Sequence, residues 1–138
     1  MLKKRNTSAE GTQRFVSRMR QEFSTYNQTS YRYLNGTDLM VSKVGYGSYR
    51  VDQQVDEHIE SLEDSIRSGC NIIDTSSNYT NGASEILIGN VLTKMMNQGK
   101  IERDEIILVS KTGYIQGDNL RDQKSVGEGK SVDLGGRR

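Results

Sequence analysis

An aspartate, a tyrosine and a lysine follow two short apolar runs of this sequence. Asp74 comes directly after the run 70–73, Tyr79 lies in the polar stretch beyond it, and Lys111 follows the run 106–109. A phenol ionises at a pKa of about 10, and a nearby lysine ammonium favours the phenolate and lowers that value. Such a tyrosine can donate a proton to a carbonyl oxygen while a hydride reaches the carbonyl carbon. The three residues therefore predict a general-acid site for carbonyl reduction, in which Asp74 holds Lys111 in place.

Spacing alone leaves a second interpretation of these residues open. Asp74 can instead bond only to backbone amides of the following turn, Tyr79 can be a half-buried loop aromatic, and Lys111 can be exposed. Neighbouring strands lie about 4.8 Å apart, so the catalytic interpretation requires the two apolar runs to pair in register. It also requires them to end at the same edge of a sheet, where α/β folds place their chemistry.

Alternating strands and helices are predicted for the middle of the chain. Residues 43–49 are typical of a strand that runs into a glycine-rich turn. Apolar residues then recur at helical spacing between positions 55 and 66, where Asp52 can cap the start and Gly69 can supply a left-handed stop. A second helix begins near Ser84. The unbroken apolar run 106–109 predicts a strand covered on both faces, and the βαβαβ order implies a parallel sheet.

The two ends of the chain differ from this middle part. Short apolar runs flank Asn35-Gly36, which predicts a β-hairpin over residues 31–41. Residues 1–30 are polar and basic, and we expect a solvated arm there, although Phe15, Met19 and Phe23 allow a short helix. Residues 118–138 contain few aliphatic side chains and many glycines, which predicts disorder.

Composition excludes several classes of protein. The formal net charge is +1, so no basic field points to nucleic acid or a membrane surface. No apolar run is long enough for membrane insertion, and none follows the first basic residues as a secretory signal requires. The single cysteine, Cys70, forms no internal disulfide or cysteine metal cluster, and we expect it to be buried. We therefore expect a cytoplasmic protein without a metal site.

Four strings of the sequence resemble the aldo-keto reductases. They are residues 45–49, 69–79, 82–89 and 110–111, of which the middle two are the most specific in their order and spacing. The resemblance covers about residues 31–117. It implies an α/β fold: the N-terminal part of a (β/α)8 TIM barrel opened by a β-hairpin, with about three of the eight barrel strands present.

The resemblance also implies residue roles. Tyr79 is similar to the family's proton donor, and Lys111 and Asp74 are similar to the pair that tunes it. Gly47, Ser48 and Tyr49 resemble the turn beside the nicotinamide of NADP, which Asp74 also contacts. Members reduce aldehydes or ketones with NADPH, so a small carbonyl compound is the implied substrate.

The sequence departs from the family in two respects. The family's catalytic histidine follows the fourth barrel strand, whereas the only histidine here, His58, lies on the first predicted helix and is not assigned to the site. The segments that grip the adenosine phosphate lie late in the family's chain, and a whole barrel needs about 250 residues. We therefore expect an incomplete, inactive fragment of such an enzyme.

Two alternatives remain open at this stage. The family includes cytoplasmic subunits of potassium channels, so the chain can be an interaction protein of that kind, which only the polar N-terminal arm favours. It can also be a non-functional truncated gene product. The sequence defines neither the substrate nor the oligomeric state.

Overall fold

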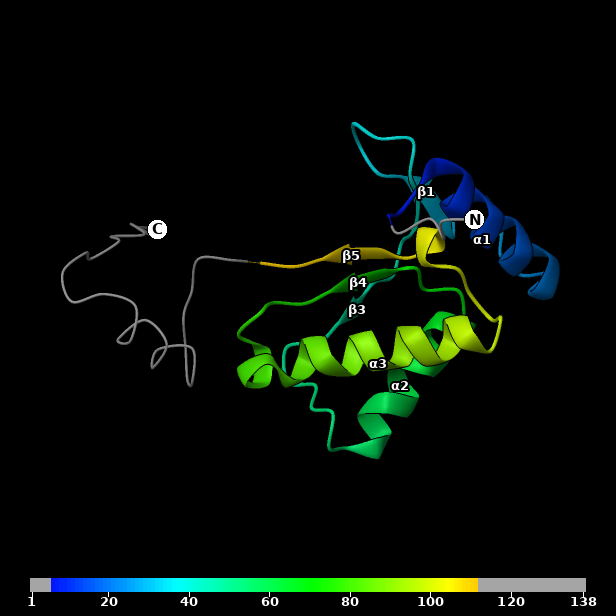
Figure 1. The fold of residues 1–138 in the computed structure, drawn as a ribbon. Coiled ribbons are helices and arrows are strands. Elements are labelled where there is room, and N and C mark those ends of the chain that lie inside the picture. Colours follow the sequence, from blue (N-terminus) through cyan, green and yellow to red (C-terminus); the bar gives the residue numbers. More distant parts are fainter. Residues whose placement is uncertain (1–5, 112–138) are drawn as a thin grey trace.

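Three parallel strands and two helices form the centre of the protein, seen here in a computed structural model that describes residues 6–111. Strands β3 (Tyr46–Gly47), β4 (Ile72–Asp74) and β5 (Ile107–Val109) form one sheet in that order. Helix α2 (Asp56–Arg67) follows β3 and α3 (Ala83–Asn97) follows β4, and both lie below the sheet in Figure 1. The predicted βαβαβ order and parallel sheet are confirmed.

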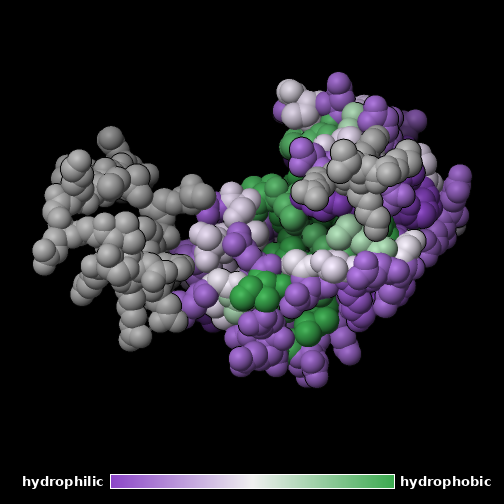
Figure 2. Space-filling view, viewed as in Figure 1, coloured by the Kyte–Doolittle hydropathy of each residue, from purple (hydrophilic) through white to green (hydrophobic). Residues whose placement is uncertain are grey.

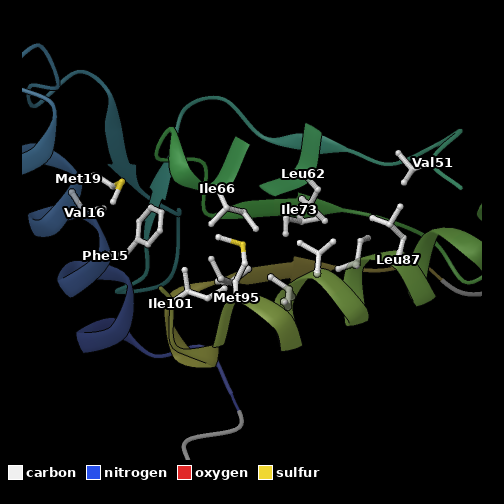
Figure 3. Close-up of a cluster of buried hydrophobic side chains, with 14 of the residues drawn as sticks. Phe15, Val16, Met19, Val51, Leu62, Ile66, Ile73, Leu87, Met95 and Ile101 are labelled. Atoms are coloured by element: carbon white, nitrogen blue, oxygen red, sulfur yellow. The ribbon is translucent and has the colours of Figure 1, made fainter. Parts of the chain in front are cut away.

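The hydrophobic core lies between the sheet and the helices. Leu62 and Ile66 of α2, Ile73 of β4 and Leu87 and Met95 of α3 each expose no more than 1% of their surface (Figure 3). Burying such a side chain completely stabilises the folded state by about 1.5–3 kcal/mol. The stripe predicted between positions 55 and 66 is therefore the face of α2 that meets the core.

The predicted hairpin is present as a separate two-stranded sheet. Strand β1 (Tyr31–Tyr33) pairs antiparallel with β2 (Met40–Ser42), with Tyr31 opposite Ser42. The turn is longer than a two-residue Asn-Gly turn: the backbone N–H of Leu34 donates to the Leu39 carbonyl at 2.9 Å. The hairpin prediction is confirmed. The bond between Leu34 and Leu39 shows that the loop between the strands is longer than two residues.

The expectation of a solvated arm is wrong for its described part. Residues 9–22 form helix α1 (Ala9–Glu22), which begins with the Ser8 side chain accepting a bond from the Gly11 N–H. Phe15, Val16 and Met19 are buried in the core (Figure 3). Phe15 and Met19, noted in the sequence, thus mark the inner face of α1, whereas Phe23 ends the helix as its C-cap residue and packs partly buried against the core.

Two basic residues of α1, Arg14 and Arg18, form ion pairs with acidic residues near the start of β5. The guanidinium of Arg18 donates to both carboxylate oxygens of Glu105 at 2.8 Å, and Arg14 donates to Asp104 at 2.6 Å. Both carboxylates lie in the short helix η2 (Arg103–Glu105) just before β5, and each side chain is only 1% exposed. The bond to Glu105 raises the pKa of Arg18. These ion pairs hold α1 to η2, so the arm no longer favours a channel-subunit role.

Replacement of Gly11 by alanine is expected to destabilise the protein. A Cβ at Gly11 would lie 2.3 Å from the backbone oxygen of Asp104, closer than any tolerated contact, so α1 would have to move. We expect the free energy of unfolding to fall by about 1–3 kcal/mol in urea denaturation. Gly89→Ala is the matched control, because a Cβ there meets nothing within 4 Å. Since alanine is the better helix former, this control should be neutral or more stable by up to about 1 kcal/mol.

Of the two residues predicted to mark the ends of α2, only Gly69 has the predicted role. Asp52 does not cap the helix: its carboxylate accepts from the Gln54 N–H, and α2 begins after Val55 without a side-chain cap. Gly69 does supply the left-handed stop, with φ of 96°. A Cβ on Gly69 would also lie 2.5 Å from the hydroxyl oxygen of Tyr31. Close contact and backbone conformation therefore both require glycine at this position.

The buried hydroxyl of Tyr31 makes stability sensitive to high pH. It donates to the Gly69 carbonyl at 2.9 Å, and burial raises the pKa of Tyr31 to about 12. Because the unfolded chain loses this proton first, the stability is fully present below about pH 10 and declines as the pH rises toward 12. We expect a loss of about 2 kcal/mol from this group. Tyr31→Phe should remove that part of the decline when unfolding is followed between pH 9 and 12; identical slopes would contradict it.

Strand β5 is less covered than its sequence predicts. Ile107 is buried, but Leu108 and Val109 expose 37% and 39% of their surface. In the described sheet β5 pairs with β4 alone, so its other edge has no strand beside it among residues 6–111. Figure 2 shows the resulting apolar strip at the level of β5. The expectation that both faces are covered is therefore wrong at these two residues.

Candidate active site

The ends of the three parallel strands meet at one edge of the sheet. Gly47, Asp74 and Val109 stand side by side in the register, so the residues that follow them lie together. Helix α1 lies at the opposite end, where β5 begins (Figure 1). Tyr49 and Lys111, two of the predicted site residues, follow the ends of β3 and β5 at this edge.

Lys111 and Asp74 form a two-pronged ion pair. The Lys111 ammonium donates to Oδ1 of Asp74 at 2.6 Å, to Oδ2 at 2.7 Å and to the Thr75 carbonyl at 3.1 Å. The hydrogen bond to Asp74 is the main cause that raises the pKa of Lys111, and the Tyr79 phenol adds to it. Both side chains of the pair are about half exposed. Lys111 therefore stays charged at neutral pH while remaining open to a ligand.

Tyr79 lies against this pair. The Lys111 nitrogen is 5.2 Å from the centre of the Tyr79 ring. On another side the ring meets Tyr49 edge to face, with ring centres 5.1 Å apart. The structure thus brings Asp74, Tyr79 and Lys111 together, as the catalytic interpretation requires, and adds Tyr49 as the contact that fixes the phenol.

The turn that presents Tyr79 has an unusual backbone. Tyr79 begins the short helix η1 (Tyr79–Gly82), inside which Thr80 has φ of 49° and Asn81 has φ of 53°. A β-branched residue rarely adopts this left-handed conformation, because its side chain crowds the following carbonyl oxygen. Holding the backbone beside the site in this conformation therefore lowers the stability of the folded protein.

Replacing Thr80 by glycine should stabilise the protein. Glycine adopts the left-handed conformation without strain, so we expect the free energy of unfolding to rise by about 1 kcal/mol. Thr93→Gly, at an exposed position of α3, should instead lower it slightly, because glycine is the poorer helix former. Thermal and urea denaturation of the two variants give the comparison, and a Thr80→Gly protein less stable than the parent would contradict the strain.

Three of the four residues predicted to touch the cofactor border an open surface. Gly47 is exposed, and a Cβ there would meet nothing within 4 Å. The Tyr49 ring is 66% exposed, and the Asp74 carboxylate is about half exposed. An accessible backbone, an aromatic face and a carboxylate are chemically suited to one side of a planar nicotinamide ring.

Ser48 differs from the other three. It is fully buried, and both its N–H and its hydroxyl donate to the Asp74 carbonyl, at 3.0 and 2.9 Å. The Ser48 side chain thus joins the turn after β3 to the end of β4. The contact between Ser48 and the cofactor stays a prediction.

Other polar residues lie near or away from this edge. The Ser110 hydroxyl donates to Glu85 of α3 at 2.7 Å, beside Lys111. His58 lies on α2, where Nδ1 accepts from the Asp52 N–H, so it takes no part in the site. Residues 6–111 hold no cluster of three or more acidic, histidine or cysteine ligands for a metal. No helix in that range is long and apolar enough to cross a membrane.

Comparison with known families gives one match over most of the chain. The family described as "Aldo/keto reductase family" matches residues 43–132. This match begins later and runs further than the resemblance placed at residues 31–117, and its last part lies outside the described residues, as does the predicted disordered segment 118–138.

Two curated proteins are similar to part of the chain. The NADH-specific methylglyoxal reductase of Escherichia coli strain K12 is 27% identical in an alignment of 92 residues that covers 59% of this chain and 26% of that protein. The uncharacterized oxidoreductase YqkF of Bacillus subtilis strain 168 is 29% identical over 82 residues, or 59% of this chain and 24% of that protein. The chain thus spans about a quarter of the length of these relatives.

Two solved structures share the fold. The holo form of aldo-keto reductase AKR11C1 from Bacillus halodurans is 29% identical with a TM-score of 0.51, covering 64% of this chain and 28% of that one. The thermostable aldo-keto reductase Tm1743, solved with the inhibitor epalrestat, is 25% identical with a TM-score of 0.51, covering 67% and 35%. These neighbours imply a TIM-barrel-type fold. The chain belongs to the aldo/keto reductase family.

Proposed function

We propose that this chain carries the proton-donating side of an NADP-dependent carbonyl reductase site. The observation that supports the proposal is the Lys111 ammonium, which binds both oxygens of Asp74 and lies 5.2 Å from the ring centre of Tyr79. A charged lysine beside a phenol favours the phenolate that forms when the proton leaves. The substrate class is small aldehydes and ketones.

Each residue has a separate part in the proposed reaction. Tyr79 donates its phenolic proton to the carbonyl oxygen of the substrate, and Lys111 stabilises the charge that develops on the phenol oxygen. Asp74 and the Thr75 carbonyl fix the ammonium in place. The nicotinamide, when bound, supplies the hydride that reaches the carbonyl carbon.

The nicotinamide end of the cofactor would lie against Gly47, Tyr49 and Asp74. Their open backbone, exposed ring and half-exposed carboxylate support this assignment. NADP is our proposal for the dinucleotide. NADH is the alternative to be compared, because the name of the Escherichia coli relative specifies NADH.

We further propose that residues 31–117 form the hairpin and about three of the eight strands of a barrel, and that this chain alone does not turn over. Mixing it with NADPH, or with NADH, and a panel of aldehydes should give no measurable oxidation of the cofactor. Oxidation that disappears in Tyr79→Phe would contradict the proposed inactivity and support the proposed site at the same time.

A chimera tests the site itself. Residues 43–111 would replace the matching segment of the Bacillus halodurans aldo-keto reductase, which provides the remaining barrel. We expect aldehyde-dependent oxidation of NADPH or NADH by this chimera, lowered by about 10²–10⁴-fold in Tyr79→Phe. The ratio of the two rates shows which dinucleotide is used.

Tyr46→Phe is the matched control in the chimera. Its hydroxyl bonds to Ser61 at 2.8 Å on α2, away from the strand ends, so this variant should keep nearly full activity. A Tyr79→Phe chimera as active as Tyr46→Phe would refute Tyr79 as the proton donor.

A further inference from the structure

Three buried hydroxyls meet beneath the candidate site. Ser48 follows β3, Thr75 follows β4 and Ser84 lies in the first turn of α3; the two serines are fully buried and Thr75 is 4% exposed. The Ser84 Oγ is 2.7 Å from the Ser48 Oγ and 3.1 Å from the Thr75 Oγ1. Side chains from three separate elements therefore join at one buried point.

The direction of the bonds follows from counting protons. The Ser48 hydroxyl donates its single proton to the Asp74 carbonyl at 2.9 Å. Ser84 must then donate toward Ser48, and Thr75 must donate to Ser84. The result is a one-way chain from Thr75 through Ser84 and Ser48 to the backbone of Asp74. Bonds in such a buried chain strengthen one another, and each hydroxyl would be costly without its partner.

Both ends of this chain of hydrogen bonds reach the Asp74–Lys111 ion pair. At one end the Asp74 carbonyl accepts from the N–H and the hydroxyl of Ser48. At the other end the Thr75 carbonyl accepts from the Lys111 ammonium at 3.1 Å, and the Thr75 N–H donates to Val109 of β5 at 2.8 Å. Ser84 thus connects to both members of the pair through one intervening residue each.

Ser84 does not act here as an ordinary helix cap. The residue that precedes α3 is Gly82, which has no side chain to cap the helix. The hydroxyl of Ser84 instead shares its single proton between the Ser48 hydroxyl and the Ser48 carbonyl and accepts from the Thr75 hydroxyl, and all of these partners lie outside α3. Its contacts therefore join α3 to the strand ends.

We propose that Ser84 is a positioning residue for the Asp74–Lys111 pair, acting through the hydroxyls of Ser48 and Thr75. The chain of bonds sets the distance between the ends of β3 and β4 and thereby the place of the carboxylate that holds Lys111. The catalytic consequence rests on the proposed function, whereas the positioning itself concerns only the ion pair.

The test is an NMR titration of the Lys111 side chain in the full chain. In the parent protein the Lys111 pKa should lie above its ordinary value of 10.5, because Asp74 holds the ammonium. In Ser84→Ala we expect that pKa to return toward 10.5, while the protein stays folded by circular dichroism. Ser110→Ala is the matched control: it removes a serine hydroxyl next to Lys111 that bonds to Glu85 at 2.7 Å, and it should leave the Lys111 pKa unchanged.

Thr75→Val provides a second variant. It removes the first hydroxyl of the chain of hydrogen bonds and keeps the shape of the side chain. The Lys111 pKa should therefore shift in the same direction as in Ser84→Ala. An unchanged Lys111 pKa in folded Ser84→Ala or Thr75→Val would overturn the proposal, as would an ordinary value in the parent. Failure of both variants to fold would assign the hydroxyls to stability alone and overturn positioning. The titration needs no cofactor or substrate, so inactivity of the enzyme leaves its result unaffected.

Discussion

Arg18→Met is expected to lower the free energy of unfolding by about 2–4 kcal/mol. Arg18 donates two bonds of 2.8 Å to Glu105, whose carboxylate is only 1% exposed. Methionine keeps the apolar stem of the side chain against the core and removes the charge. Within residues 6–111, the Glu105 carboxylate then keeps the weaker bond from Arg14 at 3.3 Å and the bond from the Glu102 N–H at 3.1 Å. Urea denaturation followed by circular dichroism measures the loss.

Two further variants separate the buried charge from other effects. Arg32→Met, at an exposed position of β1, should change the free energy of unfolding by less than about 0.5 kcal/mol. Adding Glu105→Gln to Arg18→Met removes the buried carboxylate charge that has lost its main partner, so the double variant should be less destabilised than the sum of the single ones. Additive losses, or an Arg18→Met protein as stable as Arg32→Met, would show that α1 is not held by this ion pair.

Lys111→Met is expected to lower kcat/KM of the chimera by about 10²–10⁴-fold. The substitution removes the positive charge beside the Tyr79 phenol and leaves the Asp74 carboxylate, whose negative charge disfavours a phenolate. Steady-state rates with an aldehyde and NADPH or NADH give the measurement. Lys100→Met, at the other end of the sheet before η2, is the matched control and should keep nearly full activity. Equal rates in the two variants would remove Lys111 from the mechanism.

The same pair predicts how the charge of Lys111 depends on pH. Because Asp74 raises the pKa of Lys111, the lysine stays protonated as the pH rises, and its charge is lost only above its ordinary value of 10.5. In Asp74→Asn that support is removed, so the Lys111 pKa measured by NMR titration should be lower than in the parent protein. An unchanged Lys111 pKa would show that Asp74 does not control the charge of Lys111.

The elements that depend on local pattern were predictable from the sequence. The stripe of α2, the hairpin and the left-handed stop at Gly69 each follow from the spacing or type of nearby residues. Helix α1 was not predictable in the same way, because its polar face is rich in arginine and resembles a solvated arm. Those arginines bind Asp104 and Glu105, about 90 residues further along the chain. A distant pair of buried carboxylates leaves no signal in the local sequence.

The exposure of β5 also depends on the neighbouring strands and not only on its own residues. Residues 106–109 are all aliphatic, which is typical of a strand covered on both faces. Coverage depends on which strands stand beside it, and within residues 6–111 β5 has only β4 as a neighbour. Leu108 and Val109 are therefore partly exposed despite their apolar type.

For the candidate site, the order of residues along the chain is enough to place Asp74, Tyr79 and Lys111 at or just beyond strand ends and to indicate their possible chemistry. How these groups meet depends on the folded chain. Register places Asp74 beside the end of β5, the Thr80–Asn81 turn presents Tyr79, and three buried hydroxyls join Ser48, Thr75 and Ser84. Residue types are read directly along the chain. Distances and hydrogen-bond partners between remote residues are set only when the strands pair and the helices pack, so they could not be read from the sequence.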